Sequence, residues 1–191
     1  MLFGCSAPES SIPSEYSEAN MTRFFVDEFT EFSFDNYVSY DLKPCFITID
    51  NLRPEIINNE DMTISFDEAL YDPSSETPFG FKLIVENKSN QDFIVSALET
   101  SLDLERVRVD EDRYPSEAEP SVHFYAHQVA YLVVKLKDPT PVFEQDFSFI
   151  NPDWEVLSFF VEYHQPVAPY TNYDLRPVVI YRNAFDKLVE N

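Results

Sequence analysis

The sequence contains few cysteines, few glycines and no long apolar run. Its two cysteines, Cys5 and Cys45, are too few for a disulfide framework or a four-thiolate metal site. Its two glycines cannot build a glycine-rich phosphate loop or the Gly-x-Ser-x-Gly turn of the α/β-hydrolases. No stretch approaches the roughly 18 consecutive apolar residues of a membrane-spanning helix. The sequence therefore lacks the signatures of nucleotide-binding folds and of spanning helices.

Basic residues are also scarce, because 13 Lys and Arg stand against 35 Asp and Glu, which gives a net charge of -22. The field of such a chain repels phosphate backbones and anionic lipid headgroups, so we predict no nucleic-acid ligand. A protein partner with a basic surface fits this charge. The chain is also 44% hydrophobic and 16% aromatic, which is ample for a packed core.

The stretch from Phe79 to Lys137 carries the strongest strand patterns. Residues 79–95 read as an apolar run, a polar Asn- and Ser-rich turn and a second apolar run, which predicts a β-hairpin. Residues 129–137 form the strongest predicted strand, and Pro139, which cannot donate to a ladder, ends it. The residues that we expect in the core of these and a later strand are Leu83, Val85, Leu132, Val134, Phe159 and Val161.

The remaining chain from Leu42 onward also reads as short strands. Alternating patterns predict strands at 46–50, 62–66, 98–109 and 177–181, with a loop at 67–78, a bulge near Glu105 and a final helical turn at 184–189. Residues 154–161 are apolar on both faces, which predicts a central strand. Turns that need positive φ are expected to use Asn or Asp, since glycine is so rare.

Eight or nine short strands without crossover helices indicate an all-β fold, an antiparallel sandwich. The strand, Asn87-Lys88-Ser89-Asn90 turn and strand, followed by the strand at 131–136, resembles immunoglobulin-like modules of cell-envelope proteins. The Cys-Trp-Cys core signature of true immunoglobulin domains is absent. The expected organisation is a flexible N-terminal tether at 1–19, an acidic aromatic arm at 20–41 and a β-sandwich domain at 42–191.

The arm has two readings. Met21, Phe25, Phe29 and Phe32 follow a helical spacing, while the end of the segment also alternates as a strand would. Such an aromatic stripe packs on the core in most proteins, and the alternative is an arm that folds onto a partner. We therefore expect a short helical or extended arm that contacts either the core or a partner.

The N-terminus contains a short motif with a functional meaning. Leu2-Phe3-Gly4-Cys5 resembles the lipobox of bacterial lipoproteins, in which a Leu three residues before a Cys and a small residue just before it mark lipid attachment at that Cys. The polar segment 6–15 is similar to the tether that follows a lipidated Cys, although Phe3 departs from the pattern. The resemblance implies lipid attachment at Cys5, a signal region upstream of Met1 and a place in the cell envelope, at its periplasmic or outer-membrane face. The alternative is an ordinary flexible N-terminus of a cytoplasmic protein.

Few residues suggest chemistry. His123 and His127 stand four apart, but on a strand they would lie ~13 Å apart, too far to share a metal ion. The loop after the strand at 98–109 is dense in acids, which indicates either a solvated acidic loop or a calcium site between sandwich loops. We predict no catalytic, cofactor or metal site. The candidate partner contacts in this acidic loop are Asp110, Glu111, Asp112, Tyr114, Glu117 and Glu119.

The sequence thus predicts a non-enzymatic, lipid-tethered binding or structural module of the cell envelope that engages a protein partner through an acidic surface. A soluble acidic decoy or inhibitor of the nucleic-acid-mimic type is the first alternative, and a hydrolase of unrecognised type is the second. A signal region upstream of Met1 would separate the first two hypotheses. A deep pocket with convergent polar groups would favour the third.

Overall fold

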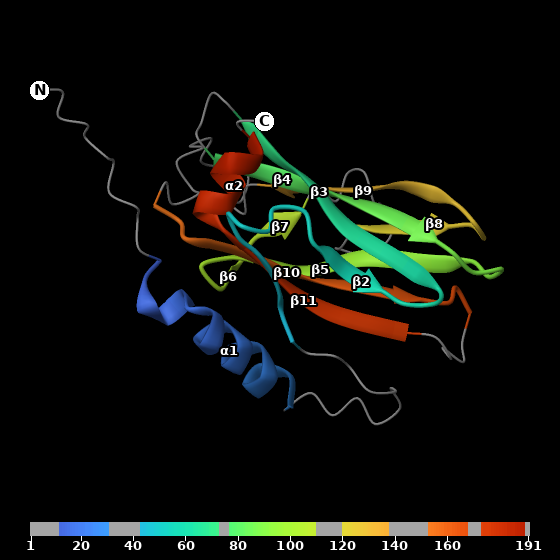
Figure 1. Ribbon diagram of the computed structural model, residues 1–191, viewed down its shortest axis with the longest axis horizontal. Helices are drawn as coiled ribbons and strands as arrows, with labels where there is room; N and C mark the ends of the chain where they lie inside the picture. Colours follow the sequence, from blue (N-terminus) through green and yellow to red (C-terminus); the bar gives the residue numbers. More distant parts are fainter. Residues whose placement is uncertain are drawn as a thin grey trace, which may run out of the picture.

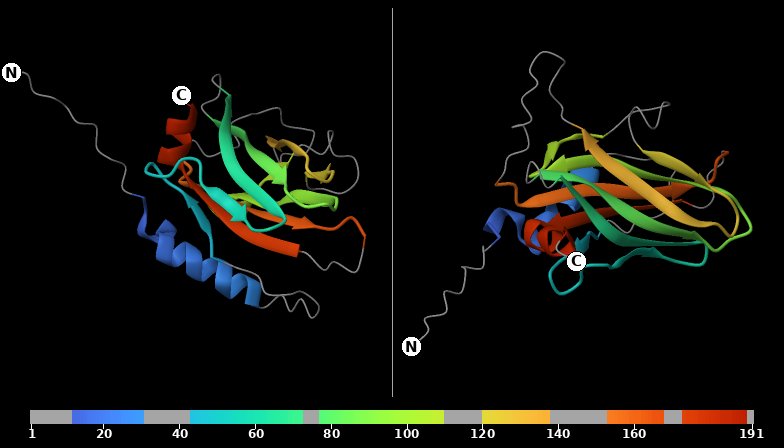
Figure 2. Two further views of the ribbon diagram at one scale, coloured as in Figure 1. Left: turned by 45° about the vertical axis from the view of Figure 1, so that its right-hand side comes forward. Right: turned by 90° about the horizontal axis from the view of Figure 1, so that it is seen from above.

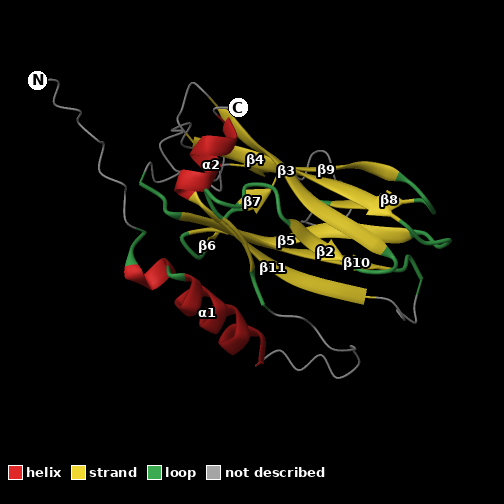
Figure 3. Cartoon of the chain, in the orientation of Figure 1, coloured by secondary structure: helices red, strands yellow, loops and turns green. Residues whose placement is uncertain are grey.

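The computed structural model describes residues 12–30, 43–72, 77–109, 120–137, 153–167 and 173–189. Over these ranges two β-sheets pack face to face, a long helix lies outside one of them, and a short helix lies at one end (Figure 1). Strands dominate the molecule, as Figure 3 shows by colour. We call the two layers sheet 1 and sheet 2.

Sheet 1 has the strand order β1 (Cys45–Ile47), β11 (Tyr173–Tyr181), β10 (Val156–His164), β5 (Phe93–Leu102) and β6 (Glu105–Arg106), with β8 (Ser121–Phe124) also paired to β5. Sheet 2 has the order β2 (Glu55–Asn58), β3 (Met62–Asp72), β4 (Thr77–Asn87), β9 (Val129–Lys137) and β7 (Arg108–Val109). The helices are a 3-10 turn η1 (Ser14–Tyr16), α1 (Glu18–Thr30) and α2 (Arg182–Val189).

The order of the strands is that of an immunoglobulin domain. In chain order, β3, β4, β5, β7, β9, β10 and β11 take the places of strands A to G, because β3-β4-β9-β7 form one sheet and β11-β10-β5 the other. The pairings among these strands are antiparallel. Strand β1 adds a parallel pairing, with Cys45 opposite Val178. The predicted all-β, antiparallel, immunoglobulin-like sandwich is therefore confirmed.

The predicted hairpin at 79–95 is wrong. β4 pairs with β3 and β9 in sheet 2, whereas β5 pairs with β10 in sheet 1, so the turn after Asn87 crosses between the sheets. A hairpin and a crossing place the same alternating residues inward, so the local pattern does not separate them. The crossing is held by Asn87, which is 1% exposed and whose side-chain amide donates to the carbonyl oxygen of Tyr125 at 3.0 Å.

The structure also differs from the prediction at the expected loop and at the expected bulge. Much of the expected loop at 67–78 is strand, because β3 runs to Asp72 and β4 starts at Thr77. The pairing of β3 with β4 shifts register between Phe66 and Glu68 and between Leu70 and Tyr71. The expected bulge near Glu105 is a tight reversal, in which Asp103 and Leu104 have φ of 46° and 67° and β5 folds back onto β6. Positive φ at two central residues suits a two-residue hairpin. Positive φ outside Asn and Asp also occurs, at Glu99, Leu104 and His127.

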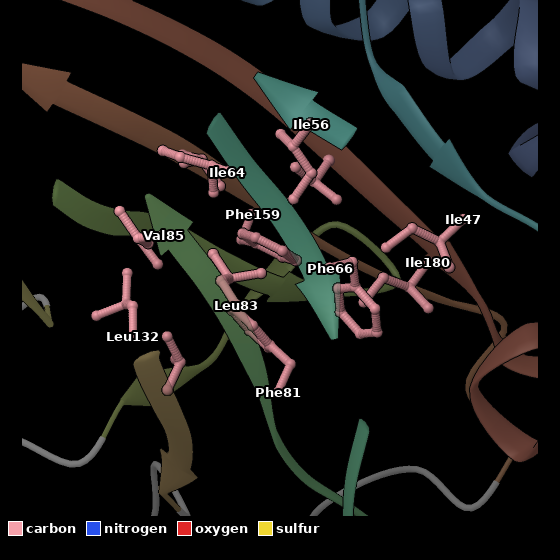
Figure 4. Close-up of a cluster of buried hydrophobic side chains, with 14 of the residues drawn as sticks. Ile47, Ile56, Ile64, Phe66, Phe81, Leu83, Val85, Leu132, Phe159 and Ile180 are labelled. Atoms are coloured by element: carbon pink, nitrogen blue, oxygen red, sulfur yellow. The ribbon is translucent and has the colours of Figure 1, made fainter. Parts of the chain in front are cut away.

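The core between the sheets follows the sequence prediction. All six expected core residues, Leu83, Val85, Leu132, Val134, Phe159 and Val161, are 0% exposed. Phe81 of sheet 2 stacks on Phe159 of sheet 1 with ring centroids 3.9 Å apart, and Figure 4 shows the two rings inside the sandwich. Helix α2 closes one end, where Phe185 packs edge-on against Trp154. The central position predicted for the strand at 154–161 is confirmed, since β10 lies between β11 and β5.

Helix α1 lies along the outside of sheet 1, as Figure 2 shows. Ser17 precedes the helix and its hydroxyl accepts the Asn20 N–H at 3.4 Å, which suits a helix N-cap. Met21 and Phe25 share one face of the helix and are 0% and 2% exposed, and the Phe25 ring meets Phe160 of β10 edge-on. These side chains form a hydrophobic cluster between α1 and sheet 1, and Ile12, the first described residue of the segment assigned to the tether, packs against it.

Candidate functional site

All of the predicted site residues lie outside the described residues. These are Cys5 and all six candidate contacts, Asp110, Glu111, Asp112, Tyr114, Glu117 and Glu119. Cys45 is described and carries a free, half-buried thiol, and burial raises its pKa to about 11. The thiol is therefore protonated near neutral pH and is a poor nucleophile.

The outer faces of the two sheets differ. Sheet 1 carries α1, whereas the outer face of sheet 2 carries no helix in the described part of the chain (Figure 2). Strand β9 presents Val129 and Tyr131 on that outer face, with 63% and 57% of their surface exposed. Tyr125, in the turn just before β9, is 61% exposed. Tyrosine side chains are among the usual anchors of protein interfaces, and an exposed Val beside one adds apolar contact area.

We define the β4–β9 face as the six outward residues of these paired strands: Lys82, Ile84, Glu86, Val129, Tyr131 and Val133. Their neighbours along each strand, such as Leu83 and Leu132, are fully buried, so the alternation of a strand turns the six outward. Tyr131 stands opposite Ile84 and therefore diagonal to both Lys82 and Glu86.

One diagonal of this face already holds a cation. The Lys82 Nζ lies 4.8 Å from the centroid of the Tyr131 ring and 3.0 Å from a carboxylate oxygen of Asp67, and it also donates to Glu68. The hydrogen bonds to Glu68 and Asp67 raise the pKa of Lys82 to about 12. Lys82 is therefore charged at neutral pH, and an ammonium group over an aromatic ring is a favourable arrangement.

The segment after β4 and the turn before β9 both cross between the sheets and meet at Asn87, and we call these two segments the corner. Besides bonding Tyr125, the Asn87 amide donates to the Gln91 carbonyl oxygen at 2.7 Å, and its own oxygen accepts the Ser89 N–H at 3.1 Å. Asp92 accepts the Ala126 N–H at 3.0 Å. Because a buried polar group is costly unless it is paired, these bonds fix the two crossings between the sheets against each other. They hold the turn that presents Tyr125.

The two histidines singled out from the sequence, His123 and His127, both bond side chains of this corner. His123 lies in β8 with its Nε2 3.0 Å from Asp92 and its ring stacked on Tyr125, centroids 4.7 Å apart. His127 lies in the turn rather than on a strand, and its Nε2 is 2.9 Å from the Asn90 oxygen. The two imidazoles therefore bond different side chains. Within the described ranges, no group of three or more His, Cys, Asp and Glu side chains is arranged to hold a metal ion.

The exposed anchors on β9 were not predicted. The pattern at 129–137 is apolar at odd as well as even positions, and this was the only sequence signal for Val129 and Tyr131. A strand apolar on both faces is read as buried, so the signal pointed to the core. None of the described helices is long and apolar enough to span a bilayer.

Comparisons with known proteins give structural likenesses only. No protein-family model and no curated protein matches the sequence. The E. coli chaperone DraB is similar over 64% of this chain and 56% of its own, with 14% identity and a TM-score of 0.36. A structure of Salmonella enterica SafA pilin in complex with the SafB chaperone is similar over 65% of this chain and 55% of that chain, with 11% identity and a TM-score of 0.35.

A third similar structure is WR4, an MSP family member of C. elegans, which is similar over 53% of this chain and 83% of its own, with 9% identity and a TM-score of 0.28. The chain thus spans about half the length of the first two structures, 56% and 55%. The fold of this chain is assigned from its own strand order and register.

Proposed function

We propose that this chain is a non-enzymatic binding module that engages a protein partner with a basic surface. The observation that carries the proposal is the exposure of Val129 and Tyr131 on the outer face of sheet 2, over which no helix lies in the described part of the chain. Exposed apolar and aromatic side chains that gather on one face mark interaction sites in many proteins. The net charge of -22 favours a basic partner and disfavours nucleic acid and anionic lipid.

The acidic loop remains part of the proposal. Asp110 follows directly after β7, the strand that pairs with β9 through Val109 and Leu136. The loop therefore starts in the sheet that carries the exposed face. Its carboxylates, Asp110, Glu111, Asp112, Glu117 and Glu119, would add to the negative field that draws a basic partner toward sheet 2, and Tyr114 would supply a further anchor.

Photo-cross-linking from β9 tests this function. A benzoylphenylalanine in place of Val129 keeps Tyr131 intact and places the reactive group on the proposed contact face. In cells of the natural host we expect an adduct with another protein. The matched control is the same substitution at Glu105, an exposed residue of β6 in sheet 1, from which we expect none. A folded protein that gives no adduct from position 129, or equal adducts from both positions, contradicts the proposal.

The second part of the proposal is a lipid anchor at Cys5 that holds the module at the cell envelope. It is supported by the resemblance of residues 2–5 to a lipobox and by the polar residues 6–15 behind it. A single acyl chain gives weak and reversible membrane binding, whereas several chains hold a protein firmly.

Fractionation tests the anchor. We expect the protein, expressed with its natural upstream sequence, to be recovered with the membranes, and the Cys5→Ser variant in the aqueous fraction. Cys45→Ser is the matched control, since Cys45 lies in β1 and should not affect anchoring. Equal distribution of the two variants would show that Cys5 carries no anchor and would leave the binding proposal to be judged by cross-linking.

A further inference from the structure

We propose that the β4–β9 face recognises an extended protein segment in which a basic side chain is flanked by apolar ones, and that Tyr131 and Glu86 bind the basic group together. The inference rests on the proposed function and names the chemistry of the partner. It follows from the register of two strands and from the charges on them.

The protein itself contains one example of a cation bound by Tyr131. Lys82 shows that the Tyr131 ring accepts a cation when carboxylates stand beside it, because its Nζ lies 4.8 Å from the ring centroid and 3.0 Å from Asp67. This distance is within the ~6 Å range of a cation–π contact. Lys82 occupies one diagonal neighbour of Tyr131, and Glu86 occupies the other.

On its other side, the Tyr131 ring again stands near a carboxylate, that of Glu86, but no described residue places a cation there. Glu86 is exposed and has no ion-pair partner among the described residues, and 57% of Tyr131 is exposed beside it. Diagonal neighbours on one sheet face are ~7 to 8 Å apart, so a Lys or Arg side chain laid between them reaches both the ring and the carboxylate. Arg fits best, since its flat guanidinium stacks on an aromatic face while pairing with a carboxylate.

The residues directly opposite Glu86 and Tyr131 on this face are apolar. Val129 stands directly opposite Glu86 and is 63% exposed, and Ile84 stands opposite Tyr131 and is partly exposed. An extended segment places alternate side chains on one face, about 7 Å apart. A basic residue over Glu86 would therefore bring an apolar residue two positions away over Ile84, while Val129 lies beside the basic side chain itself, and burial of both apolar residues adds affinity.

The charge of the chain disfavours other occupants of the β4–β9 face. A second copy of this chain would bring another net charge of -22 to the same face, and like charges across an interface are costly. Anionic lipid and nucleic acid are repelled for the same reason. Of the two exposed acids on this side of sheet 2, Glu68 is already paired with Lys82, which leaves the Glu86 carboxylate for a cation from the partner.

An NMR titration of the whole chain tests the inference. The probe is the blocked peptide Val-Thr-Arg-Thr-Val, whose first, third and fifth side chains share one face when it is extended. We expect amide shifts confined to β4 and β9. The matched probe carries citrulline in place of Arg, which keeps the shape and removes the charge, and it should bind about tenfold more weakly.

Two variants of the protein complete the test. Glu86→Gln and Tyr131→Thr should each weaken binding of the Arg peptide about tenfold, because each removes half of the cation site. Glu105→Gln makes the same charge change on sheet 1 and should alter Kd by less than about twofold. All three positions are exposed, and the dispersion of the amide spectrum checks that each variant is folded.

Shifts that map to α1 or to the Tyr125 turn, or equal losses for Glu86→Gln and Glu105→Gln, would overturn the inference. A citrulline peptide that binds as well as the Arg peptide would do the same. These outcomes are separate from the fate of the proposed function, because an adduct from position 129 would still show protein binding at sheet 2. No adduct there would count against the function itself.

Discussion

Replacing Phe81 with Ala is expected to lower the free energy of unfolding by about 3 to 5 kcal/mol. Phe81 is 0% exposed and stacks on Phe159 at 3.9 Å, which makes it a direct contact between the two sheets. Truncation removes the buried ring and leaves a cavity that the sheets cannot close, since each is held by its own ladder. Such a loss is a large part of the ~5 to 15 kcal/mol that stabilises a typical domain.

Urea unfolding followed by Trp154 fluorescence measures this loss, because Trp154 is buried beside Phe185 at the end of the same core. The control is Val129→Ala on the exposed face, which should change stability by less than about 0.5 kcal/mol. A loss below about 1 kcal/mol for Phe81→Ala would mean that the two sheets are not packed through this ring pair.

The buried residues of the sheets could be predicted from the sequence because burial of one face imposes a period of two. Leu83 and Val85 in β4, and Leu132 and Val134 in β9, follow that period without interruption. Phe159 and Val161 follow it within a strand that is apolar on both faces, because α1 covers the outer face of sheet 1. The sandwich and its central strand therefore came from local patterns alone.

The partner of each strand could not be predicted in the same way. Nothing in residues 79–95 distinguishes a hairpin from a crossing between sheets, because the decisive contact is the Asn87 amide with the distant Tyr125 carbonyl. The role of Gly80 is likewise nonlocal. A Cβ at this position would lie 2.0 Å from the Val134 carbonyl oxygen of the neighbouring strand, so only glycine permits the approach of β9.

The candidate site was predicted even less completely. An apolar strand at 129–137 indicates burial on both faces, whereas Tyr131 is exposed because no described helix lies over the outer face of sheet 2. The pairing of Lys82 in β4 with Asp67 and Glu68 in β3 depends on the register of these two strands, which sequence spacing does not contain. The predicted contacts at Asp110, Glu111 and Asp112 stay a prediction, since they lie outside the described residues.

These acids should also raise the rate at which the protein associates with a basic partner. A protein with a net charge of -22 should meet a basic partner faster than diffusion of neutral molecules allows, by ~10- to 1000-fold at low salt. Salt shortens the Debye length to ~3 Å at 1 M and should remove most of this gain. Replacing Asp110, Glu111 and Asp112 with Asn, Gln and Asn removes three negative charges and should lower the low-salt rate by about threefold or more.

Stopped-flow association with the partner identified by cross-linking from position 129, at ~0.02 M and ~0.5 M salt, therefore tests the central claim most directly. The account predicts a rate constant at least about tenfold higher at low salt, a lower rate for the triple variant, and little change in the rate of dissociation. An association rate that is the same at both salt concentrations, and the same for the triple variant, would contradict the claim that the acidic surface recruits a basic protein partner.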